Sequence, residues 1–170
     1  PSGVSGSGTF PTTAAANGTI IETLSNTNST AQDVVYTFTA NANTCTPSVT
    51  TSTVRVNPTP SFTSTPYTAV ICSGDQLNFT PSSDVAGAIF TWTSSNTGNI
   101  SGSTATGSGP ITQTITNTGD NIETLTYVIT ATAGSCVSAS TEDFTVTVRP
   151  AVRQTITNTT PVVCEGVPVN

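Results

Sequence analysis

The sequence repeats itself with a period of about 92 residues, and this self-similarity limits the folds open to the chain. Gly109–Thr118 lies over Gly18–Thr27, and the match continues without a gap until Cys136 lies over Cys45. One inserted residue later, the segment that ends at Pro150 lies over the segment that ends at Pro58. A period of this size is typical of one β-sandwich domain.

The repeat divides the chain into one full unit and two partial ones. We expect a complete repeat over residues 58–150, the C-terminal part of one repeat over 1–57, and the N-terminal part of the next over 151–170. Neither partial unit has a counterpart of residues 79–96, which carry the single Trp. Because half a sandwich exposes strand edges, we expect the parent polypeptide to continue in both directions, or neighbouring molecules to supply the missing strands.

Alternation of apolar and polar residues with period two predicts a series of short strands in the central unit, and helix signals are absent. This pattern predicts an all-β, immunoglobulin-like β-sandwich with Trp92 on its third strand. The predicted strands are Ser61–Thr65 and Thr68–Ile71 (one strand broken at Pro66), Gln76–Thr80, Ala88–Thr93, Ile111–Thr116, Leu125–Thr132 and Asp143–Val148. The predicted core is Leu77, Phe79, Phe90, Trp92, Leu125, Tyr127, Ile129, Phe144 and Val146.

Tyr127 lies four residues after Glu123, and its counterpart Tyr36 follows Gln32 at the same spacing. This placement resembles the tyrosine corner of immunoglobulin-like sandwiches, in which the phenol bonds the preceding turn. We therefore expect Tyr127 to be a core aromatic with a satisfied hydroxyl rather than a ligand-binding residue.

Composition excludes several classes of function. The chain has 3 Lys plus Arg against 9 Asp plus Glu, a formal net charge of -6. Three scattered arginines cannot neutralise a run of phosphates, so we expect no nucleic-acid partner. No apolar run approaches the roughly 20 residues that span a bilayer, so we expect no membrane insertion. With neither His nor Lys to act as a base beside Ser or Cys, we expect no enzyme activity and no cofactor.

The candidate disulfide residues are Cys45, Cys72, Cys136 and Cys164. They form no CxxC pair and the chain has no His, so paired disulfides in an oxidising, extracellular setting are favoured over a metal site. Asp120 with Glu123, or Glu142 with Asp143, would form at most a weak cation site.

Two pairings of the cysteines remain open. A bridge from Cys72 to Cys136 within one repeat would contribute roughly 4 kcal/mol through loop closure. The inferred strand order places these residues at opposite ends of the domain, beyond the roughly 7 Å Cα limit of a disulfide, and favours a bridge to the adjacent repeat. We favour the pair within the repeat, because the strand order is itself inferred.

Ile71–Thr80, Phe90–Thr93 and Tyr127–Cys136 resemble the PKD-like repeats of Bacteroidota. Such repeats occur in very large cell-surface proteins exported by the type IX secretion system, including gliding-motility adhesins. The resemblance covers the whole chain and implies export, tandem arrangement and no catalytic residues. The aspartate-rich WDFGDG-type turn of true PKD domains is absent here, so the resemblance carries no calcium site over to this chain.

We therefore expect a structural or adhesive segment, a stalk or filament, of a large secreted protein at the cell surface. Its partners would be neighbouring repeats of the same polypeptide. One alternative is a β-sandwich module that binds a glycan or another surface ligand. Another is a self-assembling extracellular filament subunit whose strands are shared between copies of the chain.

Overall fold

The computed structural model describes residues 3–8, 20–41, 43–155, 157 and 165. Every regular element within these ranges is a β-strand, and the predicted all-β, immunoglobulin-like sandwich is confirmed. The described ranges contain no helix with the length and apolar character needed to cross a membrane.

Residues 58–150 form a complete sandwich of two facing layers. Its strands are β5 (Thr68–Cys72), β6 (Gln76–Phe79), β7 (Ile89–Asn96), β8 (Ile100–Ser101), β9 (Thr106–Ser108), β10 (Ile111–Thr114), β11 (Thr116–Asn117), β12 (Glu123–Ala133), β13 (Cys136–Val137) and β14 (Glu142–Arg149). The larger layer has the order β5–β14–β12–β7–β9, with β13 paired to the end of β12. The facing layer consists of the pairs β6–β10 and β8–β11. Only the β5–β14 pair is parallel among these described strands.

Aromatic and aliphatic side chains fill the space between the two layers. Along β12, Leu125, Tyr127 and Ile129 are fully buried, and the residues between them face outward. Such alternation is what a strand with one buried face requires, since successive side chains point to opposite faces. The rings of Phe79 and Phe144 stack with centroids 4.0 Å apart. The Trp92 ring meets the Tyr127 ring edge to face at 5.3 Å, an arrangement that aromatic quadrupoles favour.

The predicted core is confirmed except at Phe90. This residue is half-buried at the rim, where its ring lies 6.0 Å from that of Phe62. The predicted strand Ser61–Thr65 is also wrong, because only Phe62 forms a bridge, to Ser83. The short strands β8, β9 and β13 were not predicted, since two or three residues are too few to show a period.

A close approach between β7 and β9 requires glycine. Gly107 pairs with Trp92, and a Cβ placed on Gly107 would lie 2.1 Å from Trp92 Cζ2. No side chain fits in that space, so Gly107 allows β9 to cross the buried indole.

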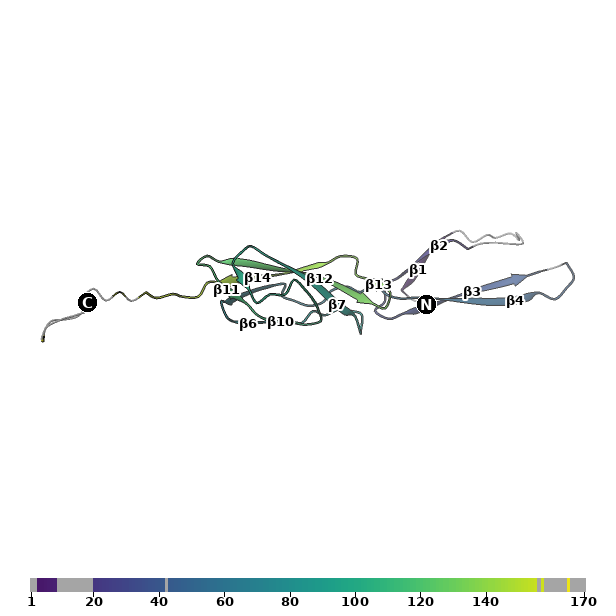
Figure 1. Cartoon of the computed structure of the whole chain (residues 1–170). Helices are drawn as coiled ribbons and strands as arrows, with labels where there is room; N and C mark the ends of the chain where they lie inside the picture. The colour runs from purple at the N-terminus through teal and green to yellow at the C-terminus, as the bar shows by residue number, and fades with distance from the viewer. Residues whose placement is uncertain (1–2, 9–19, 42, 156, 158–164, 166–170) are drawn as a thin grey trace.

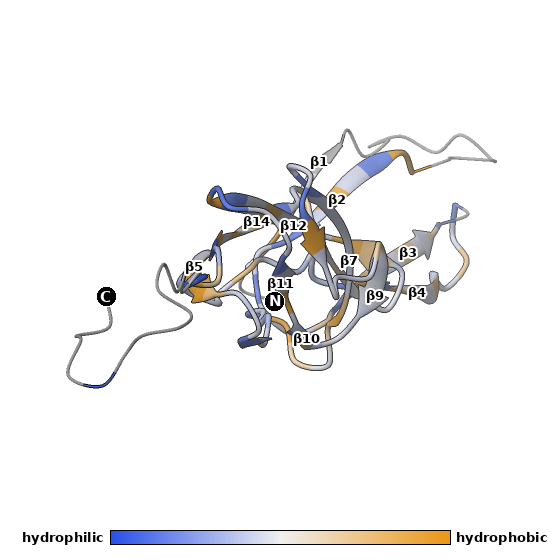
Figure 2. Ribbon diagram, turned by 60° about the vertical axis from the view of Figure 1, so that its left-hand side comes forward, coloured by the Kyte–Doolittle hydropathy of each residue, from blue (hydrophilic) through white to orange (hydrophobic). Residues whose placement is uncertain are grey.

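In the part of the chain that the structure describes, four strands precede the complete sandwich: β1 (Val4–Gly8), β2 (Glu22–Asn26), β3 (Gln32–Ala40) and β4 (Ser48–Val56). Strand β1 pairs with β2, and β3 with β4, both antiparallel. The two pairs extend beyond one end of the sandwich as separate ribbons (Figures 1 and 2). We call the described residues 3–8 and 20–57 the N-terminal segment.

The β3–β4 pair has the same register as the β12–β14 pair. Gln32 faces Val56 in the N-terminal segment, and Glu123 faces Val148 in the sandwich. In the sequence alignment these two pairs occupy corresponding positions. The N-terminal segment is therefore built with the strand pairing of the back half of the sandwich, β8–β14.

The β1–β2 pair likewise matches the β8–β11 pair. Val4 faces Asn26, and Ile100 faces Asn117. This correspondence places Val4-Ser-Gly-Ser over Ile100-Ser-Gly-Ser. Sequence comparison missed it because the offset between the units changes between residues 8 and 18.

The chain enters and leaves the complete sandwich at opposite ends (Figure 1). At the upstream end, Asn57 lies beside Gly134, with Asn57 Nδ2 4.0 Å from the position of a Cβ on that glycine. At the downstream end, the chain leaves β14 after Arg149.

Replacement of Trp92 by Ala is expected to lower the free energy of unfolding of residues 58–150 by about 3–5 kcal/mol. The indole is 6% exposed and contacts Tyr127, so its loss leaves a cavity in the core. Chemical denaturation measures the change. Thr93→Ala, on the exposed face of the same strand, is the matched control and should change stability by less than about 0.5 kcal/mol. Equal stability of the Trp92→Ala variant and the parent chain would contradict this core.

Candidate functional site

Polar side chains and loops gather at the downstream end of the sandwich. The turn after β5, the loop after β7, the turn between β11 and β12, and the chain leaving β14 meet there. We define the downstream end by these four segments, residues 72–75, 96–99, 117–123 and 149–153.

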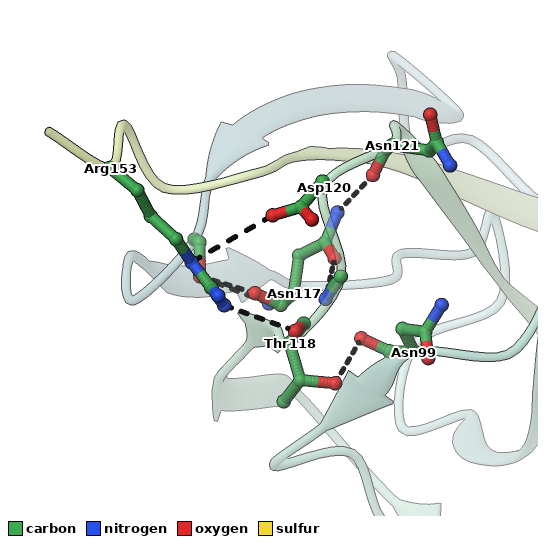
Figure 3. Close-up of polar contacts among 8 residues, drawn as sticks. Asn99, Asn117, Thr118, Asp120, Asn121 and Arg153 are labelled. Atoms are coloured by element: carbon green, nitrogen blue, oxygen red, sulfur yellow. Dashed lines mark hydrogen bonds and ion pairs between the residues drawn. The ribbon is translucent and has the colours of Figure 1, made fainter. Parts of the chain in front are cut away.

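Asn117 organises the downstream end (Figure 3). Its side chain is buried, and its Nδ2 donates hydrogen bonds to the carbonyl oxygens of Asn121, at 2.7 Å, and Val148, at 3.0 Å. Its Oδ1 accepts a hydrogen bond from the Gly119 amide at 2.9 Å. The main-chain N–H of Asn117 donates to Ser73 Oγ at 3.0 Å. One buried amide thus ties the turn to the last strand, and its polar atoms are satisfied as burial requires.

The side chain of Asn26 makes the corresponding three hydrogen bonds in the N-terminal segment. Its Nδ2 donates to the carbonyl oxygens of Thr30, at 2.9 Å, and Val56, at 2.8 Å. Its Oδ1 accepts from the Asn28 amide at 2.9 Å. The sequence alignment placed Asn26 over Asn117 but assigned neither a role.

The threonine that follows each asparagine donates two hydrogen bonds to a main-chain carbonyl oxygen, and that oxygen belongs to corresponding residues in the two units. Thr118 donates through its amide and its Oγ1 to the Asn99 carbonyl oxygen, at 2.8 and 3.2 Å. Thr27 donates through the same two groups to the Gly3 carbonyl oxygen, at 2.9 and 3.0 Å. The repeated Asn-Thr pair is the sequence signal from which this network could have been found.

The tyrosine-corner interpretation is wrong. Tyr127 Oη donates to Gln113 Oε1 at 2.7 Å, across the two layers, and not to the turn near Glu123. Tyr36 Oη donates to Glu22, the counterpart of Gln113. Burial raises the pKa of Tyr127 to about 12, because the buried site disfavours the charged phenolate.

Glu123 is buried and holds the loop after β7 against β12. Its carboxylate accepts hydrogen bonds from Thr97 Oγ1 at 2.5 Å and Asn99 Nδ2 at 3.1 Å. The hydrogen bond from Thr97, with that from Asn99, holds the pKa of Glu123 below its usual value, because both bonds favour the charged form. Across the described ranges, no three His, Cys, Asp or Glu side chains lie together as a metal site would require.

Arg153 connects the departing chain to the downstream end. Its Nη2 donates to the Thr118 carbonyl oxygen at 3.2 Å, and its Nε lies 3.8 Å from Asp120 Oδ1 (Figure 3). Both side chains of this ion pair are largely exposed, so the pair adds little to stability. Through these two contacts, Arg153 lies against the turn between β11 and β12.

The structure corrects the favoured disulfide. Cys72 lies opposite Arg149 at the downstream end, whereas Cys136 lies opposite Ala133 beyond the other end of β14. The length of β14, about 3.3 Å per residue, separates them by far more than a disulfide spans. The bridge from Cys72 to Cys136 within the repeat is therefore wrong.

Cys72 and Cys136 are free in the structure, as is the exposed Cys45 in the loop between β3 and β4. Cys164 lies outside the described residues. The bridge between adjacent repeats stays a prediction.

The family model of the PKD-like domain matches residues 2–60 and 69–152. The chain belongs to the PKD-like domain family. No curated protein and no solved structure matches it. PKD-like domains commonly occur in extracellular proteins, are typically non-catalytic, and indicate a structural or adhesive module. In this PKD-like chain, the two matched ranges contain the two copies of the asparagine network.

Stability of this PKD-like sandwich should depend on the charge of Glu123. Because its folded-state pKa lies below its unfolded value, the contribution of the carboxylate is present above the ordinary Glu pKa and is lost as pH falls through the folded value. Glu123→Gln should therefore be less stable than the parent at neutral pH, and the difference should shrink on acidification. Thermal unfolding between roughly pH 2 and pH 7 measures both.

Asp143→Asn is the control, because it removes an exposed carboxylate from the same sheet without contact to Thr97 or Asn99. A stability difference between Glu123→Gln and the parent that stays constant with pH would contradict the role given to the carboxylate.

Proposed function

We propose that this chain is a structural or adhesive segment of a large secreted cell-surface protein, built as a row of PKD-like repeats. One observation carries the proposal: the chain enters the complete sandwich at one end and leaves it at the opposite end. A fold of this kind extends a polypeptide by one domain length per repeat, and contacts between repeats are confined to neighbours.

The proposed units are the C-terminal part of one repeat at 1–57, a complete repeat at 58–150, and the N-terminal part of the next at 151–170. The shared register of β3–β4 and β12–β14 supports this division. The two asparagine networks support it independently, since each closes the downstream end of its own unit.

The hydrogen bonds at the downstream end support a structural role rather than a catalytic one. At the downstream end, Asn117 and Glu123 already have partners within the chain, so their polar atoms are committed to structure. The resemblance of the sequence to the repeats of type IX-secreted Bacteroidota proteins further supports export to the cell surface, in a protein of the gliding-adhesin type.

A glycan-binding module is the second proposal, and one observation favours it. A shallow hollow of about 460 Å³ lies over β7, β9 and β12. Its lining is neutral and rich in hydroxyl and methyl groups: Thr91, Trp92, Thr93, Thr106, Gly107, Val128 and Thr130. A neutral sugar would suit this lining better than a charged ligand, because burial of an unpaired charge is costly.

An antibody raised against residues 58–150 should label the outer surface of intact source cells in immunogold electron microscopy. Extended fibres or beaded rods should carry the label. Permeabilised cells provide the comparison, and a label that appears only after permeabilisation would contradict the proposal.

The cysteines give a covalent test of the tandem arrangement. In the native parent protein we expect Cys72, at the downstream end, to be linked to the counterpart of Cys136 at the upstream end of the following repeat. Mass spectrometry of unreduced peptides identifies the link. A peptide that joins Cys72 to Cys136 of the same repeat would contradict the strand order, and free thiols throughout would contradict the bridge.

A further inference from the structure

Residues 57–60, with the sequence Asn-Pro-Thr-Pro, connect β4 of the N-terminal segment to the body of the complete sandwich. No described strand of the N-terminal segment pairs with a strand of the sandwich, so these four residues set how the two units are oriented. Domains that share no large apolar interface move relative to one another by default. The conformation of this linker therefore decides whether the junction bends.

Every residue of this linker has a restricted backbone. The rings of Pro58 and Pro60 hold their own φ angles at about −65°. Asn57 and Thr59 each precede a proline, whose ring disfavours the helical region and keeps the preceding residue extended. Pro58 is buried and Pro60 is fully buried, so packing also holds both rings in place. A proline at every second position is typical of a semi-rigid spacer.

The chain is held in place immediately before the linker. The side chain of Asn26 donates from Nδ2 to the Val56 carbonyl oxygen at 2.8 Å and so fixes the last residue of β4. One residue later, Asn57 already lies beside Gly134 of the sandwich. The linker therefore starts from a point that is tied to the turn of the N-terminal segment and lies against the upstream end of the sandwich.

The chain is held again immediately after the linker. The main-chain N–H of Ser61 donates to Asp84 Oδ1 at 2.8 Å. The Ser61 carbonyl oxygen accepts a hydrogen bond from the Asp84 main-chain N–H at 3.2 Å. The next residue, Phe62, forms an antiparallel bridge with Ser83. Both polar groups of the Ser61 main chain are thus bonded to the sandwich, and the far end of the linker is fixed.

We propose that residues 57–60 are a stiff coupling that fixes the orientation of one PKD-like repeat relative to the next. This proposal rests on the row of repeats proposed above and goes beyond it, because a row of domains can be either stiff or jointed. With both ends of the linker anchored and each residue between them restricted, few backbone torsions remain free to bend the junction. The polypeptide would therefore keep its direction where it passes from one repeat to the next.

Distances between two spin labels on the full 170-residue chain, measured by double electron–electron resonance, test the proposal. The labels are attached at Val35→Cys on β3 and Thr93→Cys on β7, both exposed positions, with the four native cysteines replaced by Ser. A reference pair, Thr93→Cys with the exposed native Cys72 retained, lies within the sandwich alone. We expect the distance distribution across the junction to be about as narrow as the reference distribution.

Two variants should release the coupling. Pro58→Gly combined with Pro60→Gly should broaden the distribution across the junction about twofold or more, because glycine adopts many backbone conformations. Asp84→Ala removes the carboxylate that accepts from the Ser61 N–H and should also broaden the distribution. Because Asp84 is exposed, this second variant keeps the test valid if the glycine variant does not fold. In both variants the reference distribution within the sandwich should stay unchanged.

Two matched controls make the same chemical changes at the downstream end. Pro150→Gly replaces the proline that follows β14. Asp75→Ala removes a carboxylate that accepts a hydrogen bond from the Cys72 main-chain N–H at 2.9 Å. Neither control should broaden the distribution across the junction.

Three results would overturn the stiff coupling: a distribution in the parent chain much broader than the reference, no broadening in either test variant, or equal broadening in the test variants and the controls. A broad distribution would leave the proposed function intact if surface labelling of cells succeeds. Failure of surface labelling with a narrow distribution would remove the cell-surface role and keep the stiff coupling.

Discussion

The strict alternation along β12 is the constraint on which the sandwich depends. Strand β12 is the longest in the complete sandwich and lies between β7 and β14, so it has no free edge over most of its length. Its inward residues Leu125, Tyr127 and Ile129 contribute the centre of the core, and the hydroxyl of Tyr127 reaches Gln113 in the facing layer. A shift of register by one residue would exchange these buried residues of β12 for Thr126, Val128 and Thr130, which now face outward. The inward and outward residues of β12 thus fix the register in which β7 and β14 pair with it.

The downstream end of the sandwich depends on a different interaction, the buried side-chain amide of Asn117. Burial of an amide is favourable only when its donors and acceptors have partners, and Asn117 finds them in the turn and in β14. Asn26 repeats the arrangement with Thr30 and Val56. The same geometry closes both units just before the chain leaves them. This PKD-like chain therefore uses hydrophobic burial for the body of the sandwich and an amide network where the chain leaves it.

Much of the fold could be predicted from the sequence, and the failures have physical reasons. Alternation predicted the core because one face of each long strand is buried. It overestimated the burial of Phe90, because periodicity does not show where a strand reaches the rim of the sandwich. Strands of two residues, such as β8, have no period to detect. At the candidate site, the repeat alignment contained the Asn-Thr pair, but the partners of Asn117 include main-chain carbonyl groups, which carry no sequence signature. The disulfide choice failed because it depended on which strands are parallel, a property of topology that residue spacing does not determine.

The parallel pairing of β5 with β14 has a mechanical consequence. These are the first and last long strands of the complete sandwich, and they lie side by side from Thr68 opposite Thr145 to Cys72 opposite Arg149. A pull on the two ends of the domain acts along both strands in opposite directions. The evenly spaced hydrogen bonds between parallel strands then bear the load together, in shear, and do not open one after another. A row of such domains would transmit tension along its length while each hydrophobic core stays closed.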